Sequence, residues 1–282
     1  IHCFIFTNFL CAEVVPDNPS ISTSALAIVG FSFDIVLMAL TLAVMVFVLW
    51  NSKHPIVRKS SPSFCMLILT GIFFVELSFL FYCLPLSDAI CHLDDWFVIT
   101  GVALVLASLL AKSYRIYVIF HNWSAQIVQV SKWSLLVFSA SILIIAWIMM
   151  VLGGGLQAAT VQSSSDQFYS YVICEVPNLT FQMISLISFY VYFILLFLAA
   201  AILAFLNRKV SSVYSESSAV GLVVYLWIWL VILYAPIYYV QGDSTNSNQV
   251  RFALRFIATI LACSFTLIFL FYPKISRVFK RK

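Results

Sequence analysis

The chain alternates long apolar runs with short polar segments. A helix needs about 20 apolar residues to cross a membrane, and seven runs reach that length. They cover 23–50, 63–85, 92–120, 133–157, 180–206, 218–240 and 251–273. This pattern predicts an all-α membrane protein, a bundle of seven transmembrane helices.

The run from Cys91 to Phe120 sets the scale and polarity of the expected bundle. It begins with a cysteine beside Asp94 and Asp95, is apolar through its middle, and reaches Lys112 near its end. As a helix it would rise about 31 Å from Cys91 to Lys112, which matches a hydrocarbon core of roughly 30 Å. Carboxylates therefore mark one membrane face and fixed cations mark the other.

The charges orient this bundle. All of the 15 Lys and Arg except Arg251 and Arg255 fall in or beside the segments that follow the first, third, fifth and seventh runs. Because positive residues stay on the cytoplasmic side, this bias predicts an extracellular N-terminus and a cytoplasmic C-terminus. Residues 1–22 then form an extracellular segment, either a stalk or a signal-peptide remnant. The transmembrane domain covers 23–273, and 274–282 is a cytoplasmic tail.

Composition narrows the class of protein. Hydrophobic residues make up 63% of the 282 residues and charged residues 9%, which suits a multi-pass membrane protein and not a soluble domain. The net charge of +4 is divided among short clusters between apolar runs, so no nucleic-acid partner is expected. The four His lack metal-ligand spacing, and no nucleophile with a base can be assembled. We therefore expect no metal, no cofactor and no enzymatic activity.

Two carboxylates are candidates for intramembrane chemistry. Asp34 and Glu76 each lie about a dozen residues into a run, which places both near the middle of the membrane. Ionisable groups at that depth are rare and usually face the bundle interior. They could share a proton, bind a water cluster or meet Arg255, and the pocket could hold a lipid or a modulator. A purely structural hydrogen-bonded pair is an equal reading.

A second candidate pair lies on the predicted cytoplasmic side. Lys112 ends one apolar run, and Glu216, the sole carboxylate on that side, directly precedes another. The two could form an ionic latch, meaning an ion pair that ties two helices and opens on activation. The alternative is a solvated Glu and a Lys whose ammonium reaches water.

Cysteines and sequons lie on both predicted sides. Cys91 and Cys174 are both expected outside, where a disulfide can form, although either could instead pair with Cys3, Cys11 or Cys83. Asn178 begins an outer Asn-Leu-Thr glycosylation sequon beside the fifth run. The Asn-Trp-Ser sequence at Asn122 lies inside and should stay unmodified.

Several short motifs resemble one receptor family. The motifs that follow the family's order are KSSP at 59–62, AKSYR at 111–115 with IFHN at 119–122, the two outer cysteines, Glu216 and the Pro-Lys at 273–274. The chain resembles the seven-helix domain of class C G-protein-coupled receptors, and among them the type B gamma-aminobutyric acid receptors. Ser113 replaces the family's usual Thr, and the two-lobed agonist-binding domain of the family has no counterpart in these residues.

The resemblance implies a function and several site residues. It implies a plasma-membrane receptor, in contact with membrane lipids, that signals to a heterotrimeric G protein and forms a homo- or heterodimer. It favours the Cys91–Cys174 bridge and the Lys112–Glu216 latch. The implied G-protein-facing residues are Lys59, Arg115, His121, Asn122, Arg208 and Lys209. The alternative is a small transporter or channel that uses Asp34 and Glu76 as an ion or proton path.

Overall fold

The fold is a bundle of long helices. The computed structural model describes residues 13–14, 25–83, 88–121, 131–152, 157–162, 170–175, 179–207, 219–230 and 245–280. Its labelled helices are α1 (Ala25–Trp50), α2 (Pro55–Lys59), α3 (Pro62–Tyr82), α4 (Asp88–His121), α5 (Lys132–Leu152), α6 (Leu179–Leu206), α8 (Thr245–Leu270) and α9 (Tyr272–Phe279). A further apolar helix covers Ala219–Leu230.

Helices occupy part of every predicted run. Within the described residues, the helices in five of the seven runs are long and apolar enough to cross a membrane. These helices are Ile28–Trp50, Pro62–Tyr82, His92–Val118, Trp133–Leu152 and Phe252–Phe279. The apolar stretches described in the other two are shorter, at Val191–Leu206 and Ala219–Leu230. The all-helical membrane class is therefore confirmed, whereas the count of seven spans stays a prediction.

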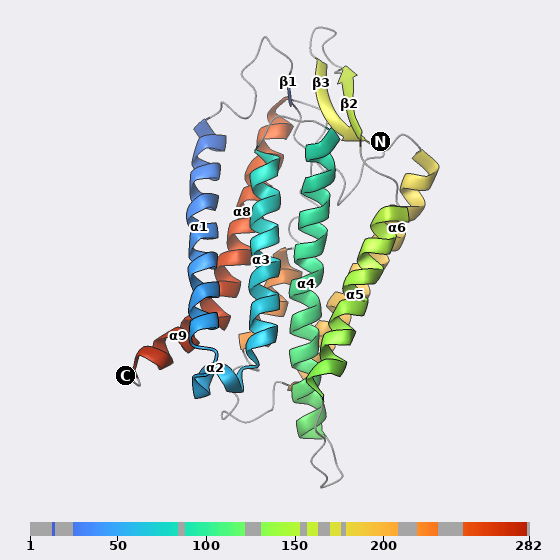
Figure 1. Cartoon of the computed structure of the whole chain (residues 1–282). Coiled ribbons are helices and arrows are strands. Elements are labelled where there is room, and N and C mark those ends of the chain that lie inside the picture. The colour runs from blue at the N-terminus through green and yellow to red at the C-terminus, as the bar shows by residue number, and fades with distance from the viewer. Residues whose placement is uncertain are drawn as a thin grey trace.

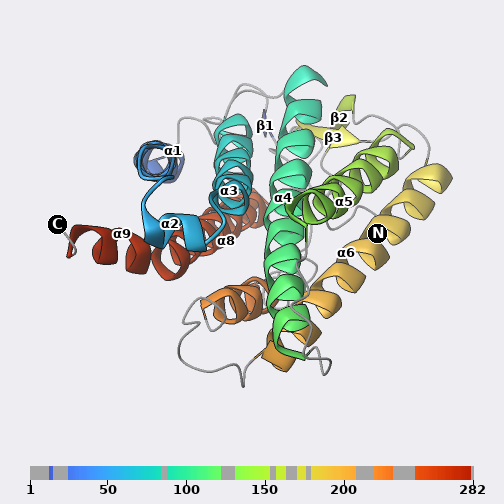
Figure 2. The ribbon, with the colours of Figure 1, turned by 60° about the horizontal axis from the view of Figure 1, so that its bottom comes forward.

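Helix α4 lies at the centre of the bundle. It runs beside α3 and α5 (Figure 1), while α8 packs against both α1 and α3 (Figure 2). In the most apolar window of each helix, 83% of the residues of α4 are buried, against 28% in α1 and 22% in α5. Helices α1 and α5 therefore turn most of their side chains to the outside of the bundle.

Two glycines let α3 and α4 approach closely. A Cβ atom added at Gly101 would lie 2.6 Å from the carbonyl oxygen of Gly71, and one at Gly71 would lie 2.8 Å from the carbonyl oxygen of Gly101. Contacts this short to backbone atoms leave no room for a methyl group. The glycine pair therefore sets the spacing of the two helices that carry most of the core.

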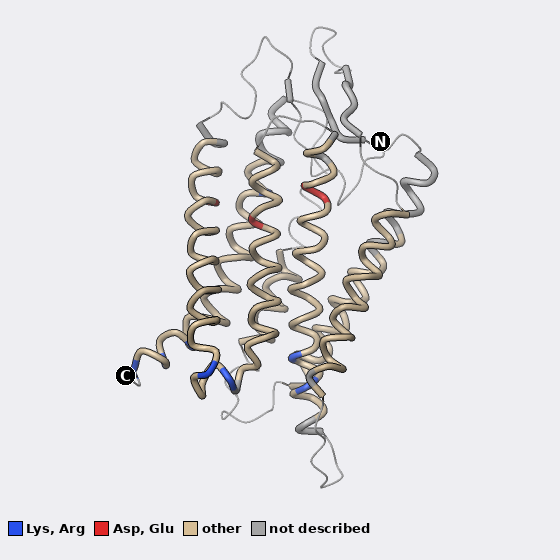
Figure 3. Tube along the Cα trace, in the orientation of Figure 1, with Lys and Arg blue, Asp and Glu red and all other residues tan. Residues whose placement is uncertain are grey.

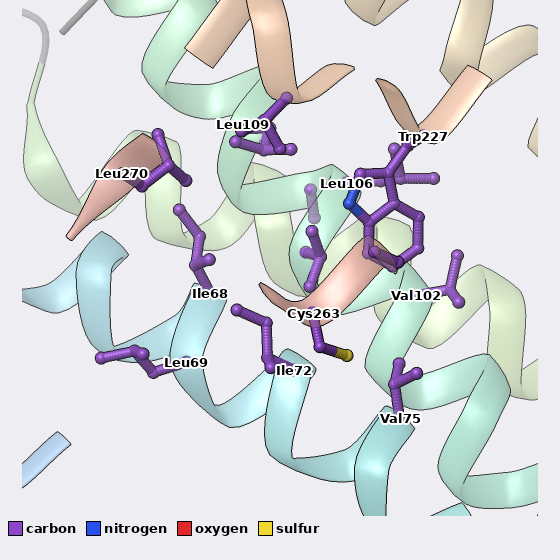
Figure 4. Close-up of a cluster of buried hydrophobic side chains, with 14 of the residues drawn as sticks. Ile68, Leu69, Ile72, Val75, Val102, Leu106, Leu109, Trp227, Cys263 and Leu270 are labelled. Carbon is purple, nitrogen blue, oxygen red and sulfur yellow. The ribbon is translucent and has the colours of Figure 1, made fainter. Parts of the chain in front are cut away.

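The core fills the space between α3, α4, α8 and the helix Ala219–Leu230. Leu106 and Leu109 of α4 face Ile68 and Ile72 of α3, and Trp227 closes one side of the cluster (Figure 4). The Trp227 indole Nε1 donates a hydrogen bond to Thr266 Oγ1 at 3.1 Å, and that hydroxyl donates to the carbonyl of Ala262 at 2.6 Å. The indole N–H of Trp227 and the hydroxyl of Thr266 are thus satisfied within the core.

Strands cover one end of the bundle. The strands are β1 (Glu13–Val14), β2 (Gln157–Gln162) and β3 (Ser170–Glu175), antiparallel and in the order β1-β3-β2. Strands β2 and β3 begin at the end of the fourth predicted run and lie before the fifth, where the sequence pattern predicted no strand. Strand β2 also packs against α4.

Short helices and basic residues mark the opposite end. Helix α9 occupies most of the segment predicted as a tail and packs on α2, and its Phe279 stacks on Phe47 of α1 at 5.9 Å between ring centroids. Figure 3 shows Lys and Arg gathered near α2, the end of α4 and α9, whereas Asp and Glu lie in the other half. This separation matches the polarity expected from the sequence.

Candidate functional site

A group of basic, hydroxyl and thiol side chains lies where α2, α3, α4 and α9 meet. We call it the basic cluster, comprising Ser60, Ser61, Cys65, Lys112, Arg115 and Lys274. The Cys65 thiol is its centre, because the ammonium groups of Lys112 and Lys274 donate to Cys65 Sγ at 3.4 and 3.5 Å. The hydroxyl of Ser60 lies 3.3 Å from the same sulfur.

The local sequence explains how this cluster forms. Pro62 occupies the first turn of α3, where a missing N–H is tolerated, and it places Cys65 one turn into the helix. Helices α3 and α4 are antiparallel, so the start of α3 lies beside the end of α4 that carries Lys112. Arg115, one turn further along α4, donates to the Ser61 hydroxyl. Ser61 has a φ of 56°, the only positive φ of a non-glycine residue among the described residues.

The two lysines of the basic cluster are buried. Lys112 is 8% exposed and Lys274 is 9% exposed. A buried ammonium group is stabilised only when polar or anionic partners replace water, and a thiol is a weak acceptor. Both lysines take part in further interactions beyond these, and Lys274 Nζ also lies 5.3 Å from the ring centroid of Phe271. The cluster thus concentrates positive charge at the end of the bundle.

A second polar group lies in the other half of the bundle. We call it the carboxyl cluster, comprising Asp34, Thr41, Glu76, Ser78, Asp94, Asp95 and Arg255. Its ion pair joins α8 to α4: the two terminal nitrogens of Arg255 donate to the carboxylate oxygens of Asp94 at 2.9 and 2.5 Å. The same guanidinium donates to Ser78 Oγ at 3.3 Å and lies 4.2 Å from the ring centroid of Tyr82.

Asp34 and Glu76 complete the carboxyl cluster. Both are fully buried at 0% exposure. Thr41 Oγ1 of α1 bonds to Glu76 Oε1 at 2.8 Å, and Asp34 lies within electrostatic range of both Glu76 and Arg255. Arg255 was considered a partner of these two carboxylates; it interacts electrostatically with Asp34, and it donates hydrogen bonds to Asp94 and Ser78.

Sequence reasoning missed the role of Asp94 because it assigned this residue to the outer carboxylates. Helix α4 begins at Asp88, a turn before the predicted run, so Asp94 and Asp95 lie inside the helix and are 2% and 4% exposed. The signal available was the placement of Arg255 within an apolar run, since a buried guanidinium requires a buried anion.

The other predicted site residues are only partly placed. The structure describes the backbone of Lys59 on α2, of Cys91 and His121 on α4, and of Cys174 on β3. Outside the described residues lie Asn122, Asn178, Arg208, Lys209 and Glu216. The disulfide and the ionic latch therefore stay predictions. Cys83, one alternative partner for the outer cysteines, is a free thiol.

Neither cluster forms a metal centre from the residues described. No group of three or more His, Cys, Asp and Glu side chains converges in that part of the chain. The geometry instead provides two polar clusters at different depths of an apolar bundle, both anchored on α3 and α4.

Comparison with known proteins assigns the family. A family model described as "7 transmembrane sweet-taste receptor of 3 GCPR" matches residues 21–274. Metabotropic glutamate receptor-like proteins H and C of Dictyostelium discoideum are 25% and 26% identical, each over 89% of this chain and 33% and 31% of the relative. Human metabotropic glutamate receptor 8 is 24% identical over 85% of this chain and 27% of its own length.

The chain thus spans about a third of the length of the curated relatives it matches. The matched relatives are named as receptors or receptor-like proteins, which favours a receptor over a transporter or channel. The matched region includes both polar clusters and every long helix. The chain therefore belongs to the class C family of seven-transmembrane G-protein-coupled receptors.

Proposed function

We propose that this chain is a class C receptor of the plasma membrane that passes an extracellular signal to a heterotrimeric G protein. The observation that carries the proposal is the basic cluster, which gathers buried Lys112 and Lys274 with Arg115 at one end of the family's helix bundle. By the positive-inside rule this end faces the cytoplasm. The G protein would dock there, against the inner ends of α4, α6 and the helix Ala219–Leu230, together with the segments 51–62, 121–132 and 207–217.

The ionic latch between Lys112 and Glu216 would hold the inactive state. Contacts among the described residues support this pairing. Asn207, at the end of α6, donates to the carbonyl of Ser113, the residue after Lys112, at 2.8 Å. A Cβ atom added at Gly221 would lie 3.6 Å from Cβ of Ala204 on α6. The helix that begins at Ala219 therefore starts close to the Lys112 end of α4.

Chain length limits how far Glu216 can lie from that point. Glu216 is three residues before Ala219, so their Cα atoms are at most about 11 Å apart. A glutamate within that reach of a buried ammonium group is a suitable partner for it. An interaction of about 1 kcal/mol would shift a two-state equilibrium about fivefold, which is enough to set basal activity.

Basal nucleotide exchange on a purified heterotrimeric G protein tests the latch. Glu216→Ala and Lys112→Ala should each raise the basal exchange rate several-fold, and the charge swap Lys112→Glu with Glu216→Lys should bring it back toward the wild-type rate. Lys53→Ala is the matched control, because Lys53 is an exposed lysine at the same end. Unchanged basal rates in both single variants, or a swap that stays as active as the singles, contradict the latch.

The finer features of the family resemblance belong to the same proposal. We infer that the chain is similar in behaviour to type B gamma-aminobutyric acid receptors, that it dimerises, and that Cys91 is bonded to Cys174. The strand register supports the bond, since Cys174 pairs with Ala158 on β2 and β2 packs against α4, the helix of Cys91. Peptide mapping with and without reduction decides whether this bridge exists.

A further inference from the structure

Buried acidic groups outnumber the paired cation in the carboxyl cluster. Asp34, Glu76, Asp94 and Asp95 are between 0% and 4% exposed. Among the hydrogen bonds of the described side chains, Arg255 neutralises one of them, Asp94. An ionised carboxylate that is buried without a partner is so unfavourable that it takes up a proton instead. The charge balance therefore points to protonated carboxyl groups.

Thr41 gives independent evidence for a proton on Glu76. A hydroxyl group has one hydrogen to donate and lone pairs to accept with. Thr41 Oγ1 lies 3.1 Å from the carbonyl oxygen of Leu37 and 2.8 Å from Glu76 Oε1, and both of these are acceptors if Glu76 is ionised. With an ionised Glu76 the single hydrogen of Thr41 is shared between the two acceptors, whereas a protonated Glu76 that donates to Thr41 leaves this hydrogen for Leu37 and makes both contacts full hydrogen bonds. A sodium ion beside an ionised Glu76 would leave this hydroxyl one hydrogen short.

Asp34 extends the same arrangement along α1. It lies seven residues before Thr41, which is two helical turns on the same face. Both of its carboxyl oxygens are buried without a hydrogen-bond partner among the described residues, as is Glu76 Oε2. An ionised Asp34 would have no group in this part of the chain to compensate its charge by hydrogen bonding.

The surrounding titratable and charged groups come from all packed elements. Helix α3 contributes Tyr82 and its terminal Cys83, α4 contributes Asp94 and Asp95, and α8 contributes Arg255 and Cys263. Of these, Arg255 carries positive charge and opposes protonation of Asp34, while its guanidinium donates hydrogen bonds to Asp94 and Ser78. The remaining groups are neutral thiols, a phenol or further acids, so none of them favours ionisation of Asp34 or Glu76.

We propose that Asp34 and Glu76 form a proton-binding site between α1 and α3, in which each carboxyl group carries a proton while α1 is packed on the bundle. The ligand is the proton itself. Opening of the contact between α1 and α3 would hydrate the two groups, and each would release its proton to water. The site thus links the packing of α1 to pH, and it does not depend on G-protein coupling.

Infrared spectroscopy of the purified chain in lipid tests the site directly. At pH 7 the wild type should show the C=O stretch of protonated carboxyl groups. Glu76→Gln and Asp34→Asn should each remove part of that band. The Gln amide can donate to Thr41 as the protonated acid does, so Glu76→Gln preserves the local hydrogen bonds. Absence of the band at pH 7, or a band unchanged by both substitutions, overturns the proposal.

Proton linkage provides a second readout that does not require assignment of a spectrum. Above the pH at which exposed carboxyl groups ionise, unfolding releases each bound proton. The folding equilibrium constant should then fall tenfold per pH unit for every proton still held by the folded chain. Glu76→Gln should reduce this slope by one proton relative to the wild type. An equal slope of stability against pH in the two proteins contradicts proton binding. In the infrared experiment, a protonated-carboxyl band that disappears when choline chloride is replaced by sodium chloride contradicts it as well.

Discussion

The buried ion pair between Arg255 and Asp94 makes a sharp prediction about stability. Arg255→Met removes the guanidinium and keeps an unbranched apolar side chain of similar reach. The substitution deletes two hydrogen bonds to Asp94, one to Ser78 and the contact with the ring of Tyr82. It also leaves the Asp94 carboxylate buried at 2% exposure without its cation.

The expected loss follows from these contacts. Breaking a buried ion pair by removing one partner costs about 3–5 kcal/mol. For a chain of this size each kcal/mol lowers the unfolding midpoint by about 2–4 °C, so the midpoint should fall by roughly 6–20 °C. Most of that loss arises because Asp94, buried without its cation, must either stay charged or take up a proton in the folded chain, and both are unfavourable at pH 7. The double variant Arg255→Met with Asp94→Asn should therefore be much more stable than the sum of the two single losses predicts.

Thermal unfolding of the purified chain in detergent, followed by circular dichroism, measures these shifts. Arg58→Met is the matched control, because Arg58 is an exposed arginine and its substitution should change the midpoint by less than about 1 °C. The reasoning is refuted if Arg255→Met behaves like this control. It is also refuted if the two single losses add in the double variant, because additivity would mean that the charges do not interact.

Two further predictions concern helix packing. Gly101→Ala should destabilise the chain by about 1–3 kcal/mol, because its methyl group would meet the Gly71 carbonyl oxygen at 2.6 Å. The control Gly221→Ala, whose Cβ would lie 3.6 Å from Ala204 Cβ, should be neutral or stabilising. Thermal unfolding midpoints compare the two variants, and equal midpoints contradict the close approach of α3 and α4. Thr266→Val should cost about 1–3 kcal/mol because it leaves the buried Trp227 N–H without its acceptor. Thr100→Val, whose bond to Trp147 is only partly buried, should cost less in the same assay, and the reverse order contradicts the assignment.

The membrane class could be predicted from the sequence because bilayer thickness imposes the length of each apolar run. Helices accordingly occupy part of each predicted run, and most of the described basic residues, Arg255 excepted, lie near one end of the bundle. The contacts between helices could not be predicted in the same way. In an apolar run the pattern does not show which face turns inward, because lipid and protein core are equally apolar.

Asp94 and Gly101 illustrate this limit. The carboxylate of Asp94 points into the bundle because α4 begins at Asp88 and has a particular rotation about its axis. Gly101 could be read from the sequence as a helix-weakening residue, and only packing against Gly71 shows why a glycine is needed there. The antiparallel pairing of β2 with β3 was likewise not predicted, since it depends on two short segments that meet only in the folded chain.

The basic cluster depended on residues distant in the chain. Cys65 and Lys274 are 209 residues apart, yet they lie 3.5 Å apart at the Sγ and Nζ atoms. Lys112 was identified as a candidate from its position at the end of an apolar run. Its partner Cys65 carried no signal of its own, because a cysteine within an apolar helix usually behaves as a small hydrophobic residue.

Nucleotide exchange tests the central claim most directly. The wild-type chain, reconstituted in lipid nanodiscs, is mixed with purified heterotrimeric G proteins, and guanine-nucleotide exchange is compared with that in empty nanodiscs. A receptor predicts faster exchange with at least one G protein and a lower rate when Arg115, in the basic cluster, is replaced by Ala. Exchange rates equal to those of empty nanodiscs with every G protein, together with ion flux through proteoliposomes that is lost in Glu76→Gln, would contradict the receptor and support a transporter or channel.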